Sequence, residues 1–266
     1  MSQNEAVYRL TSQEFFFLTE MLGLQGVAGF EDPFRGYLVD EIEEQFDQIR
    51  PGLISKGYLI QGNASAAYEI EDVLGICIAV CGASDAVQVK KFIAGSGSYD
   101  AFLYFMPNLV VEMMVDEKGS IVLSPVANAE ISFEWLFRFF PLTLRSERQC
   151  ELQLNDCSWN KWSAMTSKER AALLEEKECP EDELQPLVAA FENAERSGSM
   201  VFWNRQEYKW YTESYHYVQN EQELYLVSEI SNEDINIQAY NPEVILDGLN
   251  RFGANFDLGV EVEGGG

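Results

Sequence analysis

The sequence has few basic residues and a single histidine. Its 266 residues include 18 Lys and Arg against 44 Asp and Glu, so the formal net charge is −26. Phosphate contacts need clustered Lys and Arg, and anionic lipid surfaces attract basic segments. The composition therefore argues against nucleic-acid binding and against membrane-surface binding. One histidine, His216, cannot build an imidazole-rich zinc site, so we expect neither a metal nor a cofactor.

Cysteines and long apolar runs are also scarce. The five cysteines are an odd number and contain no CxxC pair, which predicts reduced thiols, with Cys77 and Cys81 buried on one helix. The first residues have neither the basic nor the apolar region typical of a secretory signal. No apolar run reaches the roughly 18 residues that a membrane span needs. Together these features predict a cytoplasmic protein without membrane insertion.

The sequence is nevertheless apolar enough to fold. Hydrophobic residues make up 47% of the chain and aromatic residues 13%, values that exclude a disordered acidic chain. A chain of this length buries about 70–75% of its unfolded surface and needs no disulfide or metal for a core.

The order of predicted elements occurs twice. In the first half, the capping box at residues 11–14 (TSQE) starts a helix, and further helices are expected over residues 35–50 and 68–81. Four strands follow between residues 87 and 123, and then a helix from Asn128. In the second half, a similar box at residues 166–169 (TSKE) precedes two helices, four strands between residues 199 and 239, and a helix from Asn241.

This repeat predicts an α+β fold of two similar halves. Each half would be an antiparallel sheet flanked by helices, and a quasi-two-fold axis would relate the two, with the sheets joined or stacked. The predicted division is a helical segment (1–66), a first α+β half (67–141), a connector (142–165), a second half (166–253) and a disordered tail (254–266).

Residues 53–59 (LISKGYL) look like the turn before the wing of a winged-helix DNA-binding module. The helix over residues 35–50 would then have to enter a DNA groove. That helix is rich in acidic residues, which phosphate would repel: Asp40, Glu41, Glu43, Glu44 and Asp47. We therefore interpret the segment as a helical packing module.

No catalytic constellation is visible in the sequence. A Ser-His-acid triad needs only one histidine, but there is no Gly-x-Ser-x-Gly elbow, and His216 is expected on a strand surface. The GSGS segment at residues 95–98 lacks the ending of a phosphate loop and joins two predicted strands. Among 44 acidic residues no pair can be identified as acid and base. We therefore expect a non-enzymatic binding protein.

Two aromatic groups are candidate protein-binding sites. Trp159 and Trp162 lie in the connector, where they are either anchors for a partner or a plug between the two halves. The second group lies on a predicted hairpin with aromatic side chains on both faces, one for the core and one available for recognition. Its candidate residues are Trp203, Tyr208, Trp210 and Tyr211.

The start of the chain, YRLTSQEF at residues 8–15 with LGL at 22–24, resembles the start of the EspG family, cytoplasmic chaperones of ESX (type VII) secretion systems. The segment GSIVLSP at residues 119–125 with its following helix, and the closing segment 235–252, add to this resemblance, which spans residues 7–253. Mycobacterial members carry more Arg and a Leu-Pro pair after the first helix, where this chain has LQGV at 24–27. The chain therefore looks more like a Firmicutes-type relative.

The resemblance implies a non-enzymatic cytoplasmic chaperone or adaptor. It would bind the tip of a helical-hairpin secretion substrate of the WXG or LXG type before export. An alternative from the charge is an acidic immunity or inhibitor protein that neutralises a basic toxin domain. An enzyme with a carboxylate-only site is a third alternative.

Overall fold

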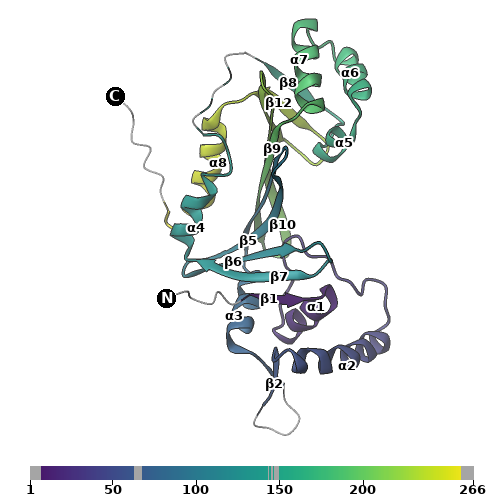
Figure 1. Cartoon of the computed structure of the whole chain (residues 1–266), viewed down its shortest axis with the longest axis vertical. Helices are drawn as coiled ribbons and strands as arrows, with labels where there is room; N and C mark the ends of the chain where they lie inside the picture. Colours follow the sequence, from purple (N-terminus) through teal and green to yellow (C-terminus); the bar gives the residue numbers. More distant parts are fainter. Residues whose placement is uncertain (1–6, 63–67, 143, 145, 147–149, 259–266) are drawn as a thin grey trace. The chain divides into compact units, whose positions relative to one another are not determined.

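The computed structural model describes residues 7–62, 68–142, 144, 146 and 150–258. These residues form an α+β fold (Figure 1), so the predicted fold class is confirmed. No helix in this described part of the chain is long and apolar enough to cross a membrane. Most of the tail that we predict to be disordered, residues 259–266, lies outside the described residues.

The helices include both that we predict from capping boxes, in which a Thr hydroxyl accepts from the N3 amide and a Glu side chain accepts in return. In chain order they are α1 (Ser12–Met21), α2 (Val39–Ser55), α3 (Asp72–Cys81), α4 (Ala129–Leu136), α5 (Trp159–Ala164), α6 (Ser167–Glu176), α7 (Glu181–Glu192) and α8 (Pro242–Ala254).

The strands fall mainly into two runs of four, as the alternating sequence predicts. They are β1 (Tyr8–Leu10), β2 (Leu59–Gln61), β3 (Tyr68–Ile70), β4 (Asp85–Ile93), β5 (Gly97–Met106), β6 (Leu109–Val115), β7 (Ile121–Ala127), β8 (Glu151–Leu154), β9 (Arg196–Gln206), β10 (Lys209–Gln219), β11 (Leu224–Glu229) and β12 (Ile235–Ala239).

Ten strands form one large antiparallel sheet, and β2 and β3 form a separate hairpin. The order in the large sheet is β1-β7-β6-β5-β4-β9-β10-β11-β12-β8. The order is symmetric about the neighbouring strands β4 and β9. On the side of β4 the strands follow in the order β5, β6, β7 and β1, and on the side of β9 they follow in the order β10, β11, β12 and β8. This symmetric order matches the repeat of elements in the sequence, and the two meanders share one sheet instead of stacking as two.

The register of β6 and β7 shows how the sheet accommodates a proline. Val115 pairs with Ile121 and Val110 with Ala127, with an irregularity between Val110 and Val111. Pro125 is the partner of Val111 at this irregularity. Proline cannot donate to a ladder and is tolerated at such bulges, so the strand continues past it.

The chain forms two compact units, each assembled from segments that are distant in the sequence. Unit 1 comprises Met1–Val87, Ala101–Ser132 and Trp203–Trp210. Unit 2 comprises Gln88–Asp100, Phe133–Phe202 and Tyr211–Gly266. The strands β4, β5, β9 and β10 therefore contribute residues to both units, whereas the division predicted above is sequential.

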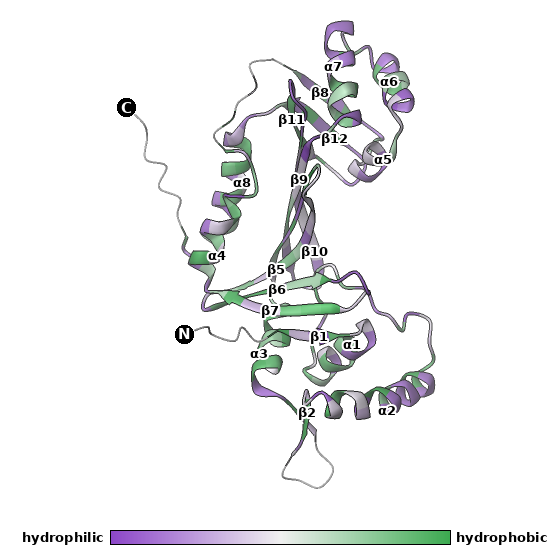
Figure 2. Ribbon diagram, viewed as in Figure 1, coloured by the Kyte–Doolittle hydropathy of each residue, from purple (hydrophilic) through white to green (hydrophobic). Residues whose placement is uncertain are grey.

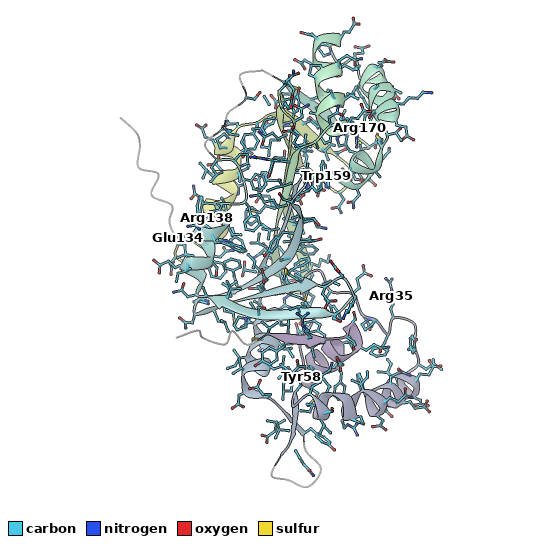
Figure 3. All side chains as sticks on the ribbon, in the orientation of Figure 1. Arg35, Tyr58, Glu134, Arg138, Trp159 and Arg170 are labelled. Carbon is cyan, nitrogen blue, oxygen red and sulfur yellow. The ribbon has the colours of Figure 1, made fainter. Side chains whose placement is uncertain are left out.

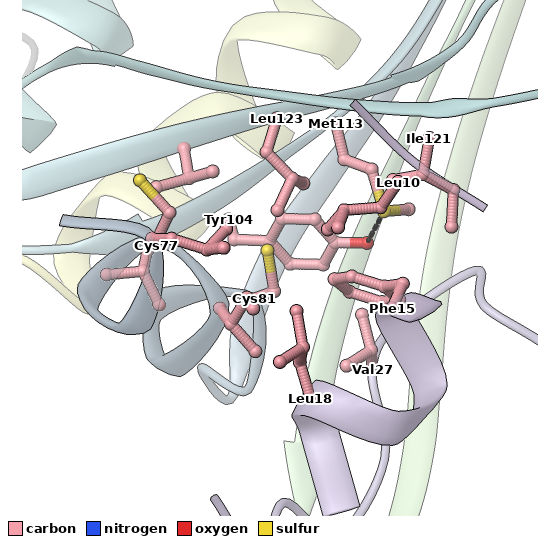
Figure 4. Close-up of a cluster of buried hydrophobic side chains, with 14 of the residues drawn as sticks. Leu10, Phe15, Leu18, Val27, Cys77, Cys81, Tyr104, Met113, Ile121 and Leu123 are labelled. Carbon is pink, nitrogen blue, oxygen red and sulfur yellow. Dashed lines mark hydrogen bonds between the residues drawn. The ribbon is translucent and has the colours of Figure 1, made fainter. Parts of the chain in front are cut away.

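The core of unit 1 packs α1 and α3 against the strands that lie in this unit (Figure 4). Tyr104 of β5 is fully buried, and its hydroxyl donates to the Ala28 carbonyl at 2.7 Å, which satisfies the buried oxygen. Cys77 and Cys81 are free, fully buried thiols on α3, as predicted. Burial raises the pKa of Cys77 to about 11, so this thiol is unreactive at neutral pH.

The core of unit 2 places α5, α6 and α7 on the strands β8, β11 and β12. Trp162 of α5 is completely buried in this core, and Phe191 of α7 meets it edge-on with ring centroids 5.4 Å apart. Arg170 of α6 lies over both rings and donates to the carbonyls of Trp162 and Ser163 at the end of α5. The buried cation therefore caps the negative end of a short helix.

Three local expectations differ from the structure. Helix α2 begins at Val39 and continues through Pro51, which costs the helix one backbone bond near its end but does not stop it. Residues 68–70 form the strand β3, since they pair with β2, and α3 begins only at Asp72. The connector contains β8 and α5, elements too short to produce a periodic pattern.

Candidate functional site

The predicted aromatic residues lie in both units. Trp159, Trp162 and Tyr211 belong to unit 2, and Trp203, Tyr208 and Trp210 belong to unit 1. Some of these side chains are accessible and others pack inside the two units.

The β9–β10 tip is held within unit 1 by polar contacts. Trp203 and Trp210 meet edge-on with centroids 6.1 Å apart, and the Arg205 guanidinium lies 5.2 Å from the Trp210 ring centroid. Arg205 also donates to the Gly82 carbonyl at 2.8 Å, and Asn204 donates to Asp85 at 2.8 Å. These contacts make the two tryptophans part of the packing of unit 1.

The two hairpin tyrosines are the accessible members of this group. Tyr208 is 83% exposed and Tyr211 is 53% exposed. Glu207 adopts a left-handed backbone (φ 56°) in the turn that precedes Tyr208. These two rings therefore remain candidates for contact with a partner.

The two connector tryptophans have different surroundings, although they are three residues apart on α5. Figure 3 labels Trp159 of this pair. Ser158 caps the helix by accepting from the Lys161 amide. Trp162 is fully buried and is a core residue, so in this structure it is not accessible to a partner. Trp159 is half-buried and stacks flat on His216, with ring centroids 4.0 Å apart and an interplanar angle of 9°.

Trp159 also lines a cavity of about 350 Å³ within unit 2. Phe92 of β4 contributes an exposed ring, and Lys90 forms an ion pair with Asp100 at 3.0 Å. The wall thus combines aromatic surface with one paired cation and anion. The residues that line the cavity are Lys90, Lys91, Phe92, Ser98, Tyr99, Asp100, Trp159, Ser197, Gly198, Ser199 and Tyr217.

His216 is buried beneath Trp159, so the expectation of a strand-surface histidine is wrong. The Ser199 hydroxyl lies 2.7 Å from Nδ1, and a Glu229 carboxylate oxygen lies 3.7 Å from Nε2. Burial lowers the pKa of His216, although Glu229 opposes this effect. The pKa of Glu229 is in turn lowered by His216.

These three groups are of the kinds found in a Ser-His-acid triad, but their geometry differs. In a triad a hydrogen-bonded acid orients the imidazole, whereas Glu229 at 3.7 Å is beyond hydrogen-bond length. The imidazole face is covered by Trp159. We therefore interpret His216, held by Ser199, as a packing surface that positions the Trp159 ring at the cavity wall. Among the described residues, no group of three or more His, Cys, Asp or Glu side chains is placed to hold a metal ion.

His216 gives unit 2 an expected sensitivity to acid. Because its pKa is lower in the folded than in the unfolded chain, the unfolded chain binds the proton first. The contribution of His216 is complete above its unfolded pKa of about 6.5 and is lost as the pH falls through its folded pKa. Between pH 7 and 5 the wild type should lose stability relative to His216→Gln, by at most about 1.4 kcal/mol per pH unit.

Urea unfolding of both proteins at several pH values measures this difference. The other carboxylates contribute equally to the pH dependence of the free energy of unfolding in both proteins, so their contribution cancels in the comparison. An identical pH dependence in the two proteins would contradict the assignment.

Sequence reasoning did not single out Phe92, Lys90 or Ser199. Lys90 and Phe92 are two residues apart on one strand and so share a face. This spacing is the feature of the sequence that could have indicated that they lie together. Nothing in the sequence indicates that Trp159 of the connector joins them at one cavity, since this depends on the packing of α5 against the sheet.

By its fold the protein belongs to the α+β class, with a ten-stranded antiparallel sheet whose strand order is symmetric. Among solved structures, the chain is similar to the Mycobacterium tuberculosis type VII secretion system chaperone EspG5, solved in complex with the PE25-PPE41 dimer. The TM-score is 0.51 at 9% sequence identity, and the match covers 92% of this chain and 94% of that chain. At this identity the likeness shows a shared fold. No protein-family model matches the chain, and neither does any curated protein.

Proposed function

We propose that this protein is a non-enzymatic, cytoplasmic chaperone or adaptor that binds a helical-hairpin type VII secretion substrate before export. The observation that carries the proposal is the EspG5-like fold, which extends over 92% of the chain. The EspG5 structure contains a bound PE25-PPE41 dimer. A WXG- or LXG-type substrate and a relationship to Firmicutes-type members of the family are the finer predictions, and they rest on the sequence resemblance described above.

The cavity beside Trp159 is suited to receive part of a protein partner. A partly buried tryptophan next to an exposed phenylalanine offers the kind of aromatic anchor that dominates binding energies. The Lys90–Asp100 pair supplies polar groups at the wall, which favour one orientation of the ligand. The volume of about 350 Å³ accommodates a few side chains at the tip of a helical hairpin.

The test is a binding experiment with defined proteins. The protein is co-expressed with each small helical protein encoded beside its gene, and the pair is analysed by size-exclusion chromatography and titration calorimetry. Stable one-to-one co-elution with a helical-hairpin protein is the expected result. Absence of binding to all of them would overturn the proposal, as would preferential binding of a basic toxin domain, which would favour an immunity protein.

Variants locate the surface that binds. If the cavity is the site, Trp159→Ala and Phe92→Ala should each weaken binding about tenfold or more. If the hairpin is the site, Tyr208→Ala and Tyr211→Ala should do so instead. Phe92→Ala is the cleaner cavity variant, because Phe92 is 42% exposed whereas Trp159 covers His216. Melting temperatures of all four variants serve as the control for folding, and unchanged affinity in all four would exclude both surfaces.

A further inference from the structure

Helix α3 in unit 1 is apolar on all sides yet only partly covered. After Asp72 its sequence, VLGICIAVC, contains no charged residue, and Figure 2 shows the helix as hydrophobic. One face is buried in the core through Leu74 and Cys77. The opposite face exposes Val73 by 42% and Ile76 by 54%. A helix without a polar face is normally buried, so the exposed side is a surface for a contact.

This side of α3 forms one wall of a groove of about 430 Å³. The end of α1 supplies Met21 and Leu22, which are 39% and 40% exposed, and β3 supplies Tyr68, which is 37% exposed. Several exposed apolar side chains from three elements therefore adjoin at one place, which is typical of an interaction site. The lining residues are Met21, Leu22, Tyr68, Glu69, Ile70, Asp72, Gly75, Ile76 and Ala79.

The groove is held in place before any partner arrives. Glu71 caps α3 by accepting from the Leu74 amide at 2.8 Å, and it also accepts from the Tyr8 hydroxyl at 2.9 Å. At Gly75 an added Cβ would meet only the Ile70 side chain, at 3.7 Å or more. The absence of a side chain at Gly75 leaves room for close approach of another helix.

The charges around the groove indicate what kind of helix fits. The charged lining residues are Glu69 and Asp72, both acidic. Arg50 lies 5.6 Å from the Tyr68 ring centroid but is already paired with Asp47 at 2.7 Å. A second copy of this chain would bring another net charge of −26, which disfavours self-association. A helix with basic residues beside its apolar stripe would be attracted.

We propose that this groove is a second protein-binding surface, which takes an amphipathic helix whose apolar stripe is flanked by Lys or Arg. The stripe would lie on Ile76, Met21 and Leu22, with the basic residues near Glu69 and Asp72. The groove lies in unit 1 and the Trp159 cavity in unit 2, so the two proposals are independent.

The probe is a fluorescein-labelled Leu/Lys peptide of about 18 residues with apolar positions at i, i+3, i+4 and i+7. Its binding to the full chain is followed by fluorescence anisotropy. We expect a Kd on the order of 10 μM. Ile76→Ser should weaken binding about tenfold, and the double variant Glu69→Gln/Asp72→Asn should weaken it and reduce its salt dependence. Ile131→Ser is the matched control, because Ile131 on α4 is 59% exposed but lies outside the groove.

Three further measurements decide the outcome. A peptide of the same composition, scrambled to remove the apolar stripe, should bind at least tenfold more weakly. Equal binding of the scrambled peptide, or equal effects of Ile76→Ser and Ile131→Ser, would show general attraction to an acidic surface and would overturn the proposal. Sedimentation showing a dimer that Ile76→Ser abolishes would also overturn it in favour of a second copy. Trp159→Ala should leave peptide binding unchanged.

Discussion

Replacing Trp162 by alanine should lower the free energy of unfolding by about 3–5 kcal/mol, the range for truncating a large buried aromatic side chain. Trp162 has no exposed surface and packs against Phe191 at a centroid distance of 5.4 Å. Its loss would leave a cavity in the core of unit 2. It would also remove the ring under the Arg170 guanidinium, whose pKa is already lowered by burial. Urea unfolding followed by far-UV circular dichroism measures the effect.

Trp162→Phe is the matched control for this substitution. Within the described residues, the buried Trp162 Nε1 has no hydrogen-bond partner, so phenylalanine removes an unsatisfied donor and keeps most of the apolar volume. We expect a loss of less than about 2 kcal/mol for phenylalanine. If alanine cost no more than phenylalanine, Trp162 would not be a packing residue, and its role as a partner anchor would have to be reconsidered.

Gly29→Ala should destabilise unit 1 by about 2–5 kcal/mol, the sum of two separate costs. Gly29 has φ +70°, a left-handed conformation that costs any other L-residue about 1–2 kcal/mol. A Cβ at this position would also lie 1.9 Å from Cζ of Phe102. The Phe102 ring cannot easily move, because it stacks on Tyr104 and contacts Trp203, and such overpacking costs about 1–3 kcal/mol.

Two variants separate these costs. Gly23 has a similar backbone (φ +66°) with no atom within 4 Å of an added Cβ, so Gly23→Ala should show the backbone cost alone. Adding Phe102→Leu to Gly29→Ala should recover part of the loss by relieving the overlap. Thermal unfolding of the four proteins measures this, and equal destabilisation by the two glycine substitutions would contradict the predicted overlap.

Local features were predictable because they depend on neighbouring residues. The capping boxes at Thr11 and Thr166 begin α1 and α6 as expected, since hydroxyl and carboxylate groups three residues apart satisfy the first amides of a helix. The strand runs of both halves follow from alternating side chains and turn residues. The repeated order of elements, visible in the sequence, reappears as the symmetric order of the ten-stranded sheet.

The candidate site was less predictable, because burial depends on what other parts of the chain cover. Trp159 and Trp162 have the same residue type in the same connector, yet one lines a cavity and the other is a core residue. The aromatic hairpin splits in the same way, with Tyr208 exposed and Trp203 partly buried and packed against the core of unit 1. His216 is buried, and the α5 tryptophan, distant in the sequence, covers one face of its ring.

The acidic composition, the α+β class and the start of most elements follow from residue types and from contacts within a few positions of the chain. The single sheet that contains both meanders, the assembly of two units from distant segments and the exposed apolar face of α3 depend on tertiary packing. Alternation and helical periodicity identify an apolar face but not the surface that covers it. For α3, the periodicity could not show that one of its faces is left uncovered.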